Sequence, residues 1–431
     1  MHFKTWRIAA AALIVAGLGC AAENWPQFRG PDGQGHADDA NLPLTWSCKE
    51  NQNVVWRTPL PGLGWSSPVI RGGQLWMTTA TGNGASLRAL CVDKATGRLL
   101  HDIEVFRPAK PFAINPLNSH ATPTPVIEEG RLYVHFGPGG TACLDTTSGA
   151  ILWKTEEFQA IYAEGPVSSP VLYRNLLIIT CDGMDVQFVA ALDKQTGKQV
   201  WKAPRAGKLK TGIYVKAYST PLVARVKEQD QLISSSADWV YGYEPLTGKE
   251  IWRVGFDGYN APPRPVAGNE LVYVCTGHDK HEVLAVRPDG QGDATATHIV
   301  WRQNKNMPLT SSLILVGREL YAVNDTGKLT CLDALTGGPI WTGQIPGTYG
   351  ASPIVAGGRL YFCSESGVIS VVAVGREFKV LATNSLAQSE QPGQKETVKA
   401  SPAVCGNALF IRSDKALYRL EEAAVPDRAG K

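Results

Sequence analysis

Two short acidic segments are the strongest candidates for chemistry in this chain. Asp182 and Asp185 flank a Gly-Met pair, and two carboxylates at that spacing could hold a cation or supply a general base. Segment 278–281 reads His-Asp-Lys-His, so His278 and Asp279 join a titratable imidazole to a carboxylate. Both segments also have an ordinary structural interpretation, because Asp-Gly and short polar runs are typical of turns.

Two further side chains are candidates for contact with a cofactor or other ligand. Trp239 lies outside the repeated tryptophan position described below, so its ring could stack on a planar molecule. Lys216 lies in a long basic segment, 202–218, that could favour an anionic ligand, since long ordered loops are often functional. The alternatives are a ring that fills space between repeats and a solvated cationic loop.

These candidates belong to a repeated framework. The phrase Asp, two residues, Thr or Ser, Gly, three residues, Trp occurs at 145–153, 193–201 and 333–341. Two variants keep the spacing, with Glu for Asp at 244–252 and His for Trp at 93–101. Repetition along the chain indicates an array of similar structural units, in which most of these residues are architectural.

Each position of the phrase has a physical role in a turn between strands. The Asp can accept backbone N–H bonds across the turn, the Gly can adopt positive φ, and the Trp can pack between neighbouring units. We expect such structural roles for Asp93, Asp145, Asp193, Asp333, Gly97, Gly149, Gly197, Gly248, Gly337, Trp56, Trp153, Trp201, Trp252, Trp301 and Trp341.

A second signature shows how many units there are. A step of small residues, usually ending in proline as in 65–68, occurs eight times, and an apolar pair such as Leu132-Tyr133 follows at a nearly constant distance. Each unit therefore contains four short strands joined by tight turns. The predicted fold is all-β, a single eight-bladed β-propeller with four antiparallel strands in each blade.

The two ends of the chain fit a closed ring. The eighth unit ends near Leu420 without a Trp strand, whereas segment 53–57 matches the Trp strands of other units. We expect this N-terminal strand to complete the last blade, which removes exposed sheet edges. The predicted organisation is an export signal at 1–22, an N-terminal strap at 23–51, the propeller at 52–421 and a flexible tail at 422–431.

The first residues and the overall charge restrict location and partners. Segment 1–22 has a basic start, an apolar run and small residues at its end, which is typical of an export signal. Lipidation at Cys20 is the alternative, although Gly17 replaces the leucine usual three residues before such a cysteine. A net charge of +3 provides no electrostatic footprint for nucleic acid.

The remaining cysteines do not suggest a disulfide framework. Cys91, Cys143 and Cys331 all lie two residues before the Asp of the repeated phrase, on equivalent strands of different units. We expect them to be small buried hydrophobic residues, not disulfide partners.

The Asp-x-x-Thr-Gly-x-x-x-Trp phrase, together with the Ser-Ser-Pro strand, resembles the tryptophan-docking repeat of pyrroloquinoline quinone (PQQ)-type propellers. The opening Trp-Pro-Gln-Phe-Arg-Gly-Pro-Asp-Gly-Gln-Gly at 25–35 resembles the start of many exported PQQ-like repeat proteins. The resemblance implies one of two classes: quinoprotein alcohol and glucose dehydrogenases with PQQ and Ca²⁺, or non-catalytic proteins such as the BamB-like outer-membrane assembly lipoproteins.

The resemblance also implies what a dehydrogenase site needs. Such enzymes hold the quinone between a Trp and, in the alcohol-oxidising members, a disulfide of adjacent cysteines; they bind Ca²⁺ through Glu and Asn and use an Asp as base. This chain has no adjacent cysteine pair. We therefore expect an exported, monomeric, non-catalytic propeller without cofactor, which binds a protein or peptide partner in the periplasm or cell envelope.

The alternative hypothesis is a PQQ- and Ca²⁺-dependent quinoprotein oxidoreductase acting on an alcohol or sugar. In that case Asp182 or Asp185 is the candidate base. Trp239, Lys216 and the pair His278-Asp279 are the candidate cofactor contacts.

Overall fold

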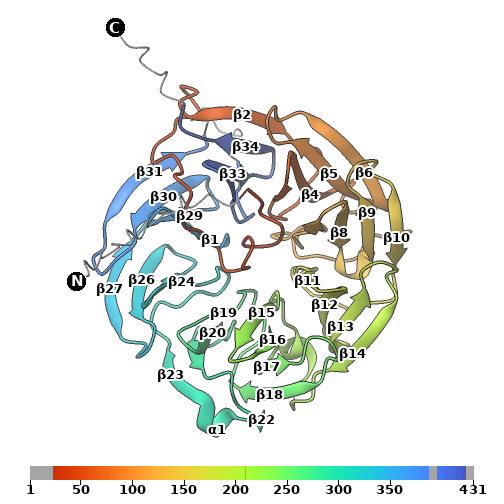
Figure 1. Ribbon diagram of the computed structural model, residues 1–431, viewed down its shortest axis with the longest axis vertical. Helices are drawn as coiled ribbons and strands as arrows, with labels where there is room; N and C mark the ends of the chain where they lie inside the picture. Colours follow the sequence, from red (N-terminus) through yellow and green to blue (C-terminus); the bar gives the residue numbers. More distant parts are fainter. Residues whose placement is uncertain (1–22, 209, 388–395, 424–431) are drawn as a thin grey trace, which may run out of the picture.

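Eight small β-sheets surround a central axis in the computed structural model of the protein, which describes residues 23–208, 210–387 and 396–423 (Figure 1). Each sheet is one blade, and its first strand in the sequence lies nearest the axis except for the additional short strands β1 and β22 and for the outer strand β2. The predicted all-β, eight-bladed propeller with four antiparallel strands per blade is confirmed. The segments 1–22 and 424–431 lie outside the described residues, so the export signal, Cys20 and most of the proposed tail stay predictions.

The strands follow one another from the axis outward in each blade. The first four blades comprise β3 (Val69–Arg71), β4 (Gln74–Thr81), β5 (Ser86–Asp93) and β6 (Leu99–Phe106); β7 (Val126–Glu128), β8 (Arg131–His135), β9 (Thr141–Asp145) and β10 (Ile151–Thr155); β11 (Val171–Tyr173), β12 (Leu176–Asp182), β13 (Gln187–Asp193) and β14 (Gln199–Pro204); and β15 (Leu222–Val226), β16 (Gln229–Ser235), β17 (Trp239–Tyr243) and β18 (Glu250–Gly255).

The next three blades follow the same order. They comprise β19 (Val266–Gly268), β20 (Leu271–Cys275), β21 (Val283–Val286) and β23 (Ile299–Gln303); β24 (Ile314–Val316), β25 (Glu319–Val323), β26 (Lys328–Asp333) and β27 (Pro339–Gln344); and β28 (Ile354–Ala356), β29 (Arg359–Cys363), β30 (Val368–Ala373) and β31 (Val380–Ser385). Short elements outside the blades are the 3₁₀ helices η1 (Gly137–Gly139) and η2 (Gly212–Val215) and the helix α1 (Thr295–His298).

The eighth blade is assembled from both ends of the chain. Its inner strands β32 (Ala403–Cys405), β33 (Ala408–Arg412) and β34 (Ala416–Leu420) come from the C-terminal end, and β2 (Val54–Pro59) supplies the outer strand. β2 pairs with β34 in antiparallel fashion, with Arg57 opposite Tyr418. Figure 1 shows β2 beside β34 at the rim. The predicted closure by an N-terminal strand is confirmed.

Tryptophans of the outer strands connect each blade to the next. In five blades the indole N–H donates to a backbone carbonyl in the turn before the neighbouring outer strand, and the ring lies against that turn. A Cβ on Gly197, for example, would lie 2.5 Å from the ring of Trp153. The five bonds are Trp56 to Lys94 (3.1 Å), Trp153 to Lys194 (3.0 Å), Trp201 to Pro245 (3.2 Å), Trp301 to Ala334 (2.9 Å) and Trp341 to Gly375 (2.9 Å).

Trp252 differs from the other repeat tryptophans. Its indole N–H donates to Gln231 Oε1 within its own blade, at 2.8 Å, although its ring still packs against the next blade. The reason is local: β21 and β23 are joined by an excursion that contains α1 and β22 (Gly292–Asp293), so the usual turn is missing there. β22 instead pairs in parallel with β18 and extends the sheet of the fourth blade.

Hydroxyl groups connect the blades near the axis. The residue two positions before the innermost strand, usually followed by proline, is Ser or Thr in seven blades. In six of these blades its hydroxyl accepts the backbone N–H of the equivalent residue one blade earlier. Two arcs result: Ser67 to Thr124 to Ser169 to Thr220, and Arg264 to Ser312 to Ser352 to Ser401. We call these residues the hydroxyl belt. In the fifth blade Arg264 takes the place of the hydroxyl residue.

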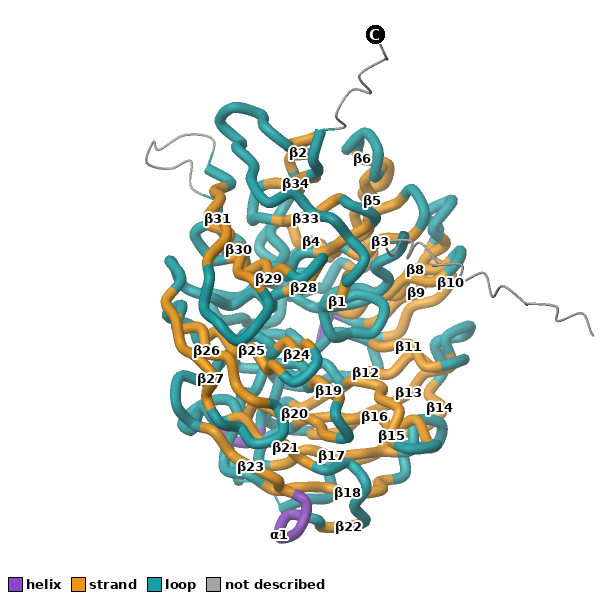
Figure 2. The backbone as a smooth tube through the Cα atoms, turned by 60° about the vertical axis from the view of Figure 1, so that its left-hand side comes forward, coloured by secondary structure: helices purple, strands orange, loops and turns teal. Residues whose placement is uncertain are grey.

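Residues 25–37, part of the predicted 23–51 strap and called the strap from here on, bond to blades on different sides of the ring, and Figure 2 shows β1 (His36–Ala37) next to β28. β1 pairs in parallel with β28. Hydrogen bonds join the strap to the inner segments of five blades: Trp25 with Ile70, Pro26 with Ile127, Phe28 with Arg264, Gln34 with Ala267, Gly35 with Val355 and His36 with Leu315.

All eight cysteines of the described residues are buried and unpaired. Cys91, Cys143 and Cys331 occupy equivalent strands of different blades, as the repeat indicated. The expectation that they are small core residues and not disulfide partners is confirmed. Burial raises the pKa of the Cys143 thiol to about 11, so this thiol stays protonated at neutral pH.

Removal of residues 24–57 should destabilise the ring, because it deletes the strap and leaves the backbone groups of β34 without the partner strand β2. We expect a lower melting temperature and self-association through the exposed edge, measured by thermal unfolding and sedimentation velocity. Val55→Ser, at a position 49% exposed on β2, is the control and should change neither property. A truncated chain that stays monomeric with the wild-type melting temperature would contradict the closure argument.

His36 should make the strap's attachment dependent on pH. Its Nδ1 lies 2.6 Å from Asp32 Oδ2 and its Nε2 2.8 Å from the Leu315 carbonyl, and both partners only accept, so the ring is held as imidazolium. Burial lowers the pKa of His36, but the Asp32 hydrogen bond and charge outweigh it and leave that pKa raised. A raised pKa means that this stabilisation is complete below 6.5, the ordinary value, and is lost as pH rises through the folded-state pKa.

The free energy of unfolding should therefore fall by about 1–2 kcal/mol across that pH range in the wild type and not in His36→Gln. Urea titrations at a series of pH values measure the difference. His298→Gln, which changes a histidine distant from the strap in the sequence, should keep the wild-type pH dependence. Identical pH profiles for wild type and His36→Gln would show that His36 does not hold the strap.

Candidate functional site

A pocket of about 350 Å³ opens along the propeller axis, enclosed by the segments that precede the innermost strands. Members of the hydroxyl belt form a polar girdle inside it, and Phe28 of the strap also lines it. Apolar side chains from several blades complete the wall. The lining includes Ser67, Thr124, Ser169, Thr220, Ser312, Ser352 and Ser401 of the belt, with Trp65, Leu117, Val167, Pro262 and Leu309 as the larger apolar members.

One carboxylate of the pocket is neutralised from within the protein. Glu164 Oε1 lies 2.5 Å from the ammonium of Lys216, whose side chain is only 5% exposed, and the Tyr218 hydroxyl donates to Glu164 Oε2. Burial, reinforced by the Glu164 hydrogen bond, raises the pKa of Tyr218, which keeps this hydroxyl a donor. Lys216 follows η2 directly, so the basic loop predicted to receive a ligand instead places its lysine against a carboxylate of the same chain.

A second pair of charges lies elsewhere on the pocket wall. Lys399 Nζ lies 3.9 Å from Glu365 Oε1 and 5.6 Å from the centre of the Trp65 ring, and it donates to the Leu117 carbonyl at 2.8 Å. This geometry is a cation–π contact combined with a weak ion pair. The pocket thus has one closely paired carboxylate, Glu164, and a second, Glu365, whose partner Lys399 lies near the limit of ion-pair distance. The rest of its surface is mostly apolar.

The oxygen donors of the pocket do not match the set that a PQQ and Ca²⁺ site needs. The Glu and Asn side chains that line the pocket are Glu164, Glu365, Asn115, Asn118 and Asn260, and no aspartate of the described residues lines the wall. Lys216 and Tyr218 already use the Glu164 carboxylate, and Lys399 lies 3.9 Å from Glu365. The Oδ1 atoms of Asn115 and Asn118 already accept from the Leu117 backbone N–H and the Thr122 hydroxyl. Nor do three His, Cys, Asp or Glu side chains gather as a metal site anywhere in the part of the chain that the structure describes. The residues present therefore do not fit the quinone and its cation without displacement of Lys216.

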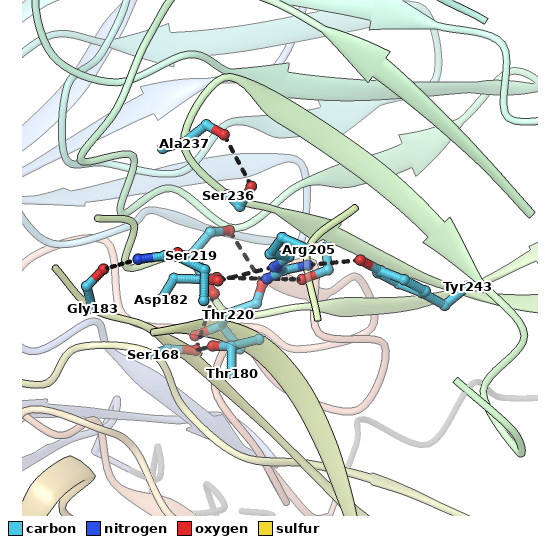
Figure 3. Close-up of polar contacts among 12 residues, drawn as sticks. Ser168, Thr180, Asp182, Gly183, Arg205, Ser219, Thr220, Ser236, Ala237 and Tyr243 are labelled. Carbon is cyan, nitrogen blue, oxygen red and sulfur yellow. Dashed lines mark hydrogen bonds and ion pairs between the residues drawn. The ribbon is translucent and has the colours of Figure 1, made fainter. Parts of the chain in front are cut away.

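Asp182, one of the two candidate bases, lies in a buried ion pair with Arg205 (Figure 3) and is not among the residues that line the central pocket. Arg205 donates Nε–H to Asp182 Oδ1 at 2.9 Å and Nη2–H to Oδ2 at 2.5 Å, and Ser234 and Tyr243 accept further guanidinium bonds. Burial raises the pKa of Asp182, and Arg205 opposes this rise. A carboxylate held in this bidentate pair is not free to accept a substrate proton.

The other candidates are also separate from the pocket. Asp185 is exposed and accepts the Ile161 backbone N–H at 2.7 Å, which fixes a loop. Trp239 is half-buried, donates to the Lys208 carbonyl at 2.9 Å and receives the Arg253 guanidinium on its ring. His278 and Asp279 are exposed neighbours at a hairpin tip, bonded to each other at 2.8 Å. Of the cofactor candidates, only Lys216 lies next to a pocket-lining residue.

Several pocket residues were missed because they lie in the repeat itself. Trp65 and Lys399 each stand two residues before the hydroxyl-belt position, where other blades have Thr, Val, Tyr, Pro or Gly. That position lines the pocket in all eight blades. The available signal in the sequence was a large aromatic ring and a cation at a position where six other blades carry neither a Trp nor a charged residue.

A family profile matches most of the chain. A family profile described as outer membrane protein assembly factor BamB matches residues 44–156, 90–226 and 290–414. These matches span well over half of the chain, which therefore belongs to this family of PQQ-like propellers. The resemblance drawn from the tryptophan-docking repeat is confirmed.

Sequence similarity to individual curated proteins covers a smaller part of the chain than the family profile does. A 170-residue stretch is 28% identical to methanol dehydrogenase (cytochrome c) subunit 1 of Methylobacterium organophilum, covering 35% of this chain and 26% of the relative. The same values describe the relative from Methylorubrum extorquens. The match thus spans about a quarter of the length of these curated relatives.

Solved structures share the architecture at low identity. BamB from Moraxella catarrhalis superposes with a TM-score of 0.59 and 12% identity, covering 85% of this chain and 99% of that one. Quinohemoprotein alcohol dehydrogenase from Comamonas testosteroni gives 0.67 and 9%, covering 95% and 82%. At these identities the likeness shows the fold alone. Among the described residues, no helix has the length and apolar character needed to cross a membrane.

Asp182→Asn should destabilise the protein strongly, because the buried guanidinium of Arg205 would lose its counter-charge. We expect the free energy of unfolding to fall by about 3–5 kcal/mol. Asp185→Asn, three residues away but exposed, is the matched control and should cost about 1 kcal/mol or less. Chemical denaturation measures both values, and equal small losses would contradict the structural role of the Asp182–Arg205 pair.

Proposed function

We propose that this protein is an exported, non-catalytic propeller of the cell envelope that holds a segment of another envelope protein at the mouth of its central pocket. The observation that supports this most directly is the internal neutralisation of Glu164 by Lys216 and Tyr218. A redox site needs a free carboxylate near the reacting atoms, whereas a binding surface needs satisfied charges and apolar contact area.

Exposed apolar side chains in the pocket and on segments that lead to pocket residues would provide that contact area. Leu117 lines the pocket and is 73% exposed, while Ile161 is 58% exposed in the loop that leads to Glu164. Ile213 and Tyr214 are 48% and 44% exposed on η2, which leads to Lys216. Large apolar side chains exposed together at a concave opening are typical of protein interaction sites. The occupant we propose is an extended, largely apolar polypeptide segment.

Family membership supports the same class of function. The family description names an assembly factor of outer membrane proteins, and the predicted export signal at 1–22 would place this chain in the same compartment. The contrary observation is the 170-residue similarity to methanol dehydrogenase, together with the presence of Glu164 and Asn260 on one pocket wall. A PQQ-dependent oxidoreductase is therefore the second candidate function.

Two measurements on the purified mature protein distinguish the candidates. Titration with PQQ and Ca²⁺, followed by tryptophan fluorescence and thermal unfolding, should produce no shift at about 100 µM ligand, since only a ligand of the folded state raises the melting temperature by mass action. A saturable shift, followed by dye reduction with an alcohol or sugar, would overturn the scaffold proposal in favour of the oxidoreductase.

Site-specific photo-crosslinking tests the binding face. A photoreactive residue at Leu117 should form a discrete adduct with an envelope polypeptide in living cells. The same residue at Leu246, 38% exposed on a turn at the rim of the fourth blade, is the control and should form none. Equal labelling from both positions would count against a partner at the pocket mouth.

A further inference from the structure

Two buried guanidinium groups lie where the strap meets the channel wall, and the proposed function makes no use of them. Arg29 belongs to the strap and is 1% exposed; Arg264 precedes β19 in the fifth blade and is 2% exposed. The two charges are close enough that Arg29 lowers the pKa of Arg264, an effect secondary to burial.

The hydrogen-bond donors of this pair are only partly satisfied. Arg29 Nη2 donates to the Leu313 carbonyl at 2.6 Å, whereas its Nε and Nη1 are buried without any partner among the described residues. Arg264 donates from Nη1 to the Phe28 carbonyl at 2.7 Å and from Nη2 to Gln27 Oε1 at 3.4 Å, but its Nε is buried and unpartnered within the same part of the chain. Buried polar groups are normally paired, so three unpaired donors on two neighbouring cations need an explanation.

The charge of the pair is also uncompensated. Neither guanidinium forms an ion pair within the described ranges, and the carboxylate whose charge both feel is that of Asp32. Asp32 already bonds His36 through Oδ2, at 2.6 Å, and the Gln34 backbone N–H through Oδ1, at 2.8 Å. Desolvation of a cation without a counter-charge is among the most costly events in a protein interior.

The local backbone is shaped around these side chains. A Cβ on Gly33, where φ is +71°, would lie 2.4 Å from Arg264 Nη1, and one on Gly35, where φ is +92°, would lie 3.0 Å from Arg29 Nη2. Glycine at both positions lets the strap backbone approach the guanidinium groups closely. So close an approach leaves no room here for an extended molecule, so a ligand of these donors would be limited to one or a few atoms.

Arg264 differs from the residues at the equivalent positions of the other blades. Seven blades place a neutral hydroxyl at the belt position, and only the fifth has a guanidinium there, opposite the strap arginine. A hydroxyl would satisfy the neighbouring blade without introducing charge. The second cation therefore creates a requirement for negative charge that the fold itself does not meet.

We propose that Arg29 and Arg264 bind one small monovalent anion of halide size, enclosed between the strap and the channel wall. The anion would accept from Nε of Arg264 and from either Nε or Nη1 of Arg29, and it would neutralise part of the buried charge. Its binding would stabilise the strap and, through Phe28, the wall of the central pocket. Ordered water is the competing occupant: it could accept the same hydrogen bonds but would supply no charge.

Crystals of the mature protein grown in sodium bromide test the proposal on the unaltered chain. We expect an anomalous bromide peak within hydrogen-bond distance of Nε or Nη1 of Arg29 and of Nε of Arg264. Density without anomalous signal there, which indicates water, would overturn the proposal. Bromide found only at surface positions would overturn it equally.

Thermal unfolding in solution shows whether the site is occupied outside a crystal. At fixed pH and ionic strength, replacement of gluconate, too large for the site, by chloride or bromide should raise the melting temperature saturably by a few degrees. Arg264→Gln should lose this increment. Arg412→Gln is the matched control, because Arg412 is equally buried but bonds Ser66 and not the strap, so this variant should be less stable yet keep the halide increment.

The unfolding measurements and the bromide diffraction test the same anion site independently. A wild-type protein without a saturable halide effect, or an Arg264→Gln variant that keeps the whole effect, would overturn it. If Arg264→Gln does not fold, the bromide diffraction on the native chain still gives the answer.

Discussion

The contact between each blade and the next is the interaction on which the rest of the structure depends. A four-stranded sheet of this size cannot bury both of its faces alone, so each blade requires two neighbours. Two sets of bonds hold them: tryptophan indoles at the rim, such as Trp153 to the Lys194 carbonyl, and hydroxyls near the axis, such as Ser169 accepting from Thr124. Because both sets follow one repeat, the ring acts as a rigid frame, and the segments between blades are free to vary.

The repeated contacts could be predicted from the sequence, whereas the variable segments between blades could not. The turn and tryptophan positions recur with fixed spacing, so strand order, blade number and the split last blade could all be inferred from it. The exception at Trp252 could not, because it depends on the excursion that contains α1 and β22 in the following blade. The spacing of residues within one repeat predicts the contacts that the repeat makes. It does not predict that an insertion in the next blade removes one of those contacts.

The candidate site was much harder to infer. Residues chosen for their chemistry, such as Asp182 and His278, belong to a buried ion pair and to a hairpin tip, since titratable side chains also serve the fold. The pocket instead arises where eight equivalent positions converge on the axis, and its character comes from side chains such as Trp65 and Lys399 that break the repeat. These positions come together only when the ring closes, so the pocket cannot be predicted from any single segment of the sequence.

The split eighth blade links the architecture to the order in which the chain is made. β2 forms near the beginning of the chain, yet its partner β34 ends at Leu420, close to the other end. During synthesis, β2 is made long before β34 and has no partner strand until nearly all other strands have been made. The last blade therefore acts as a completion check: only a chain synthesised as far as β34 can pair β2 with its partner strand and close the ring.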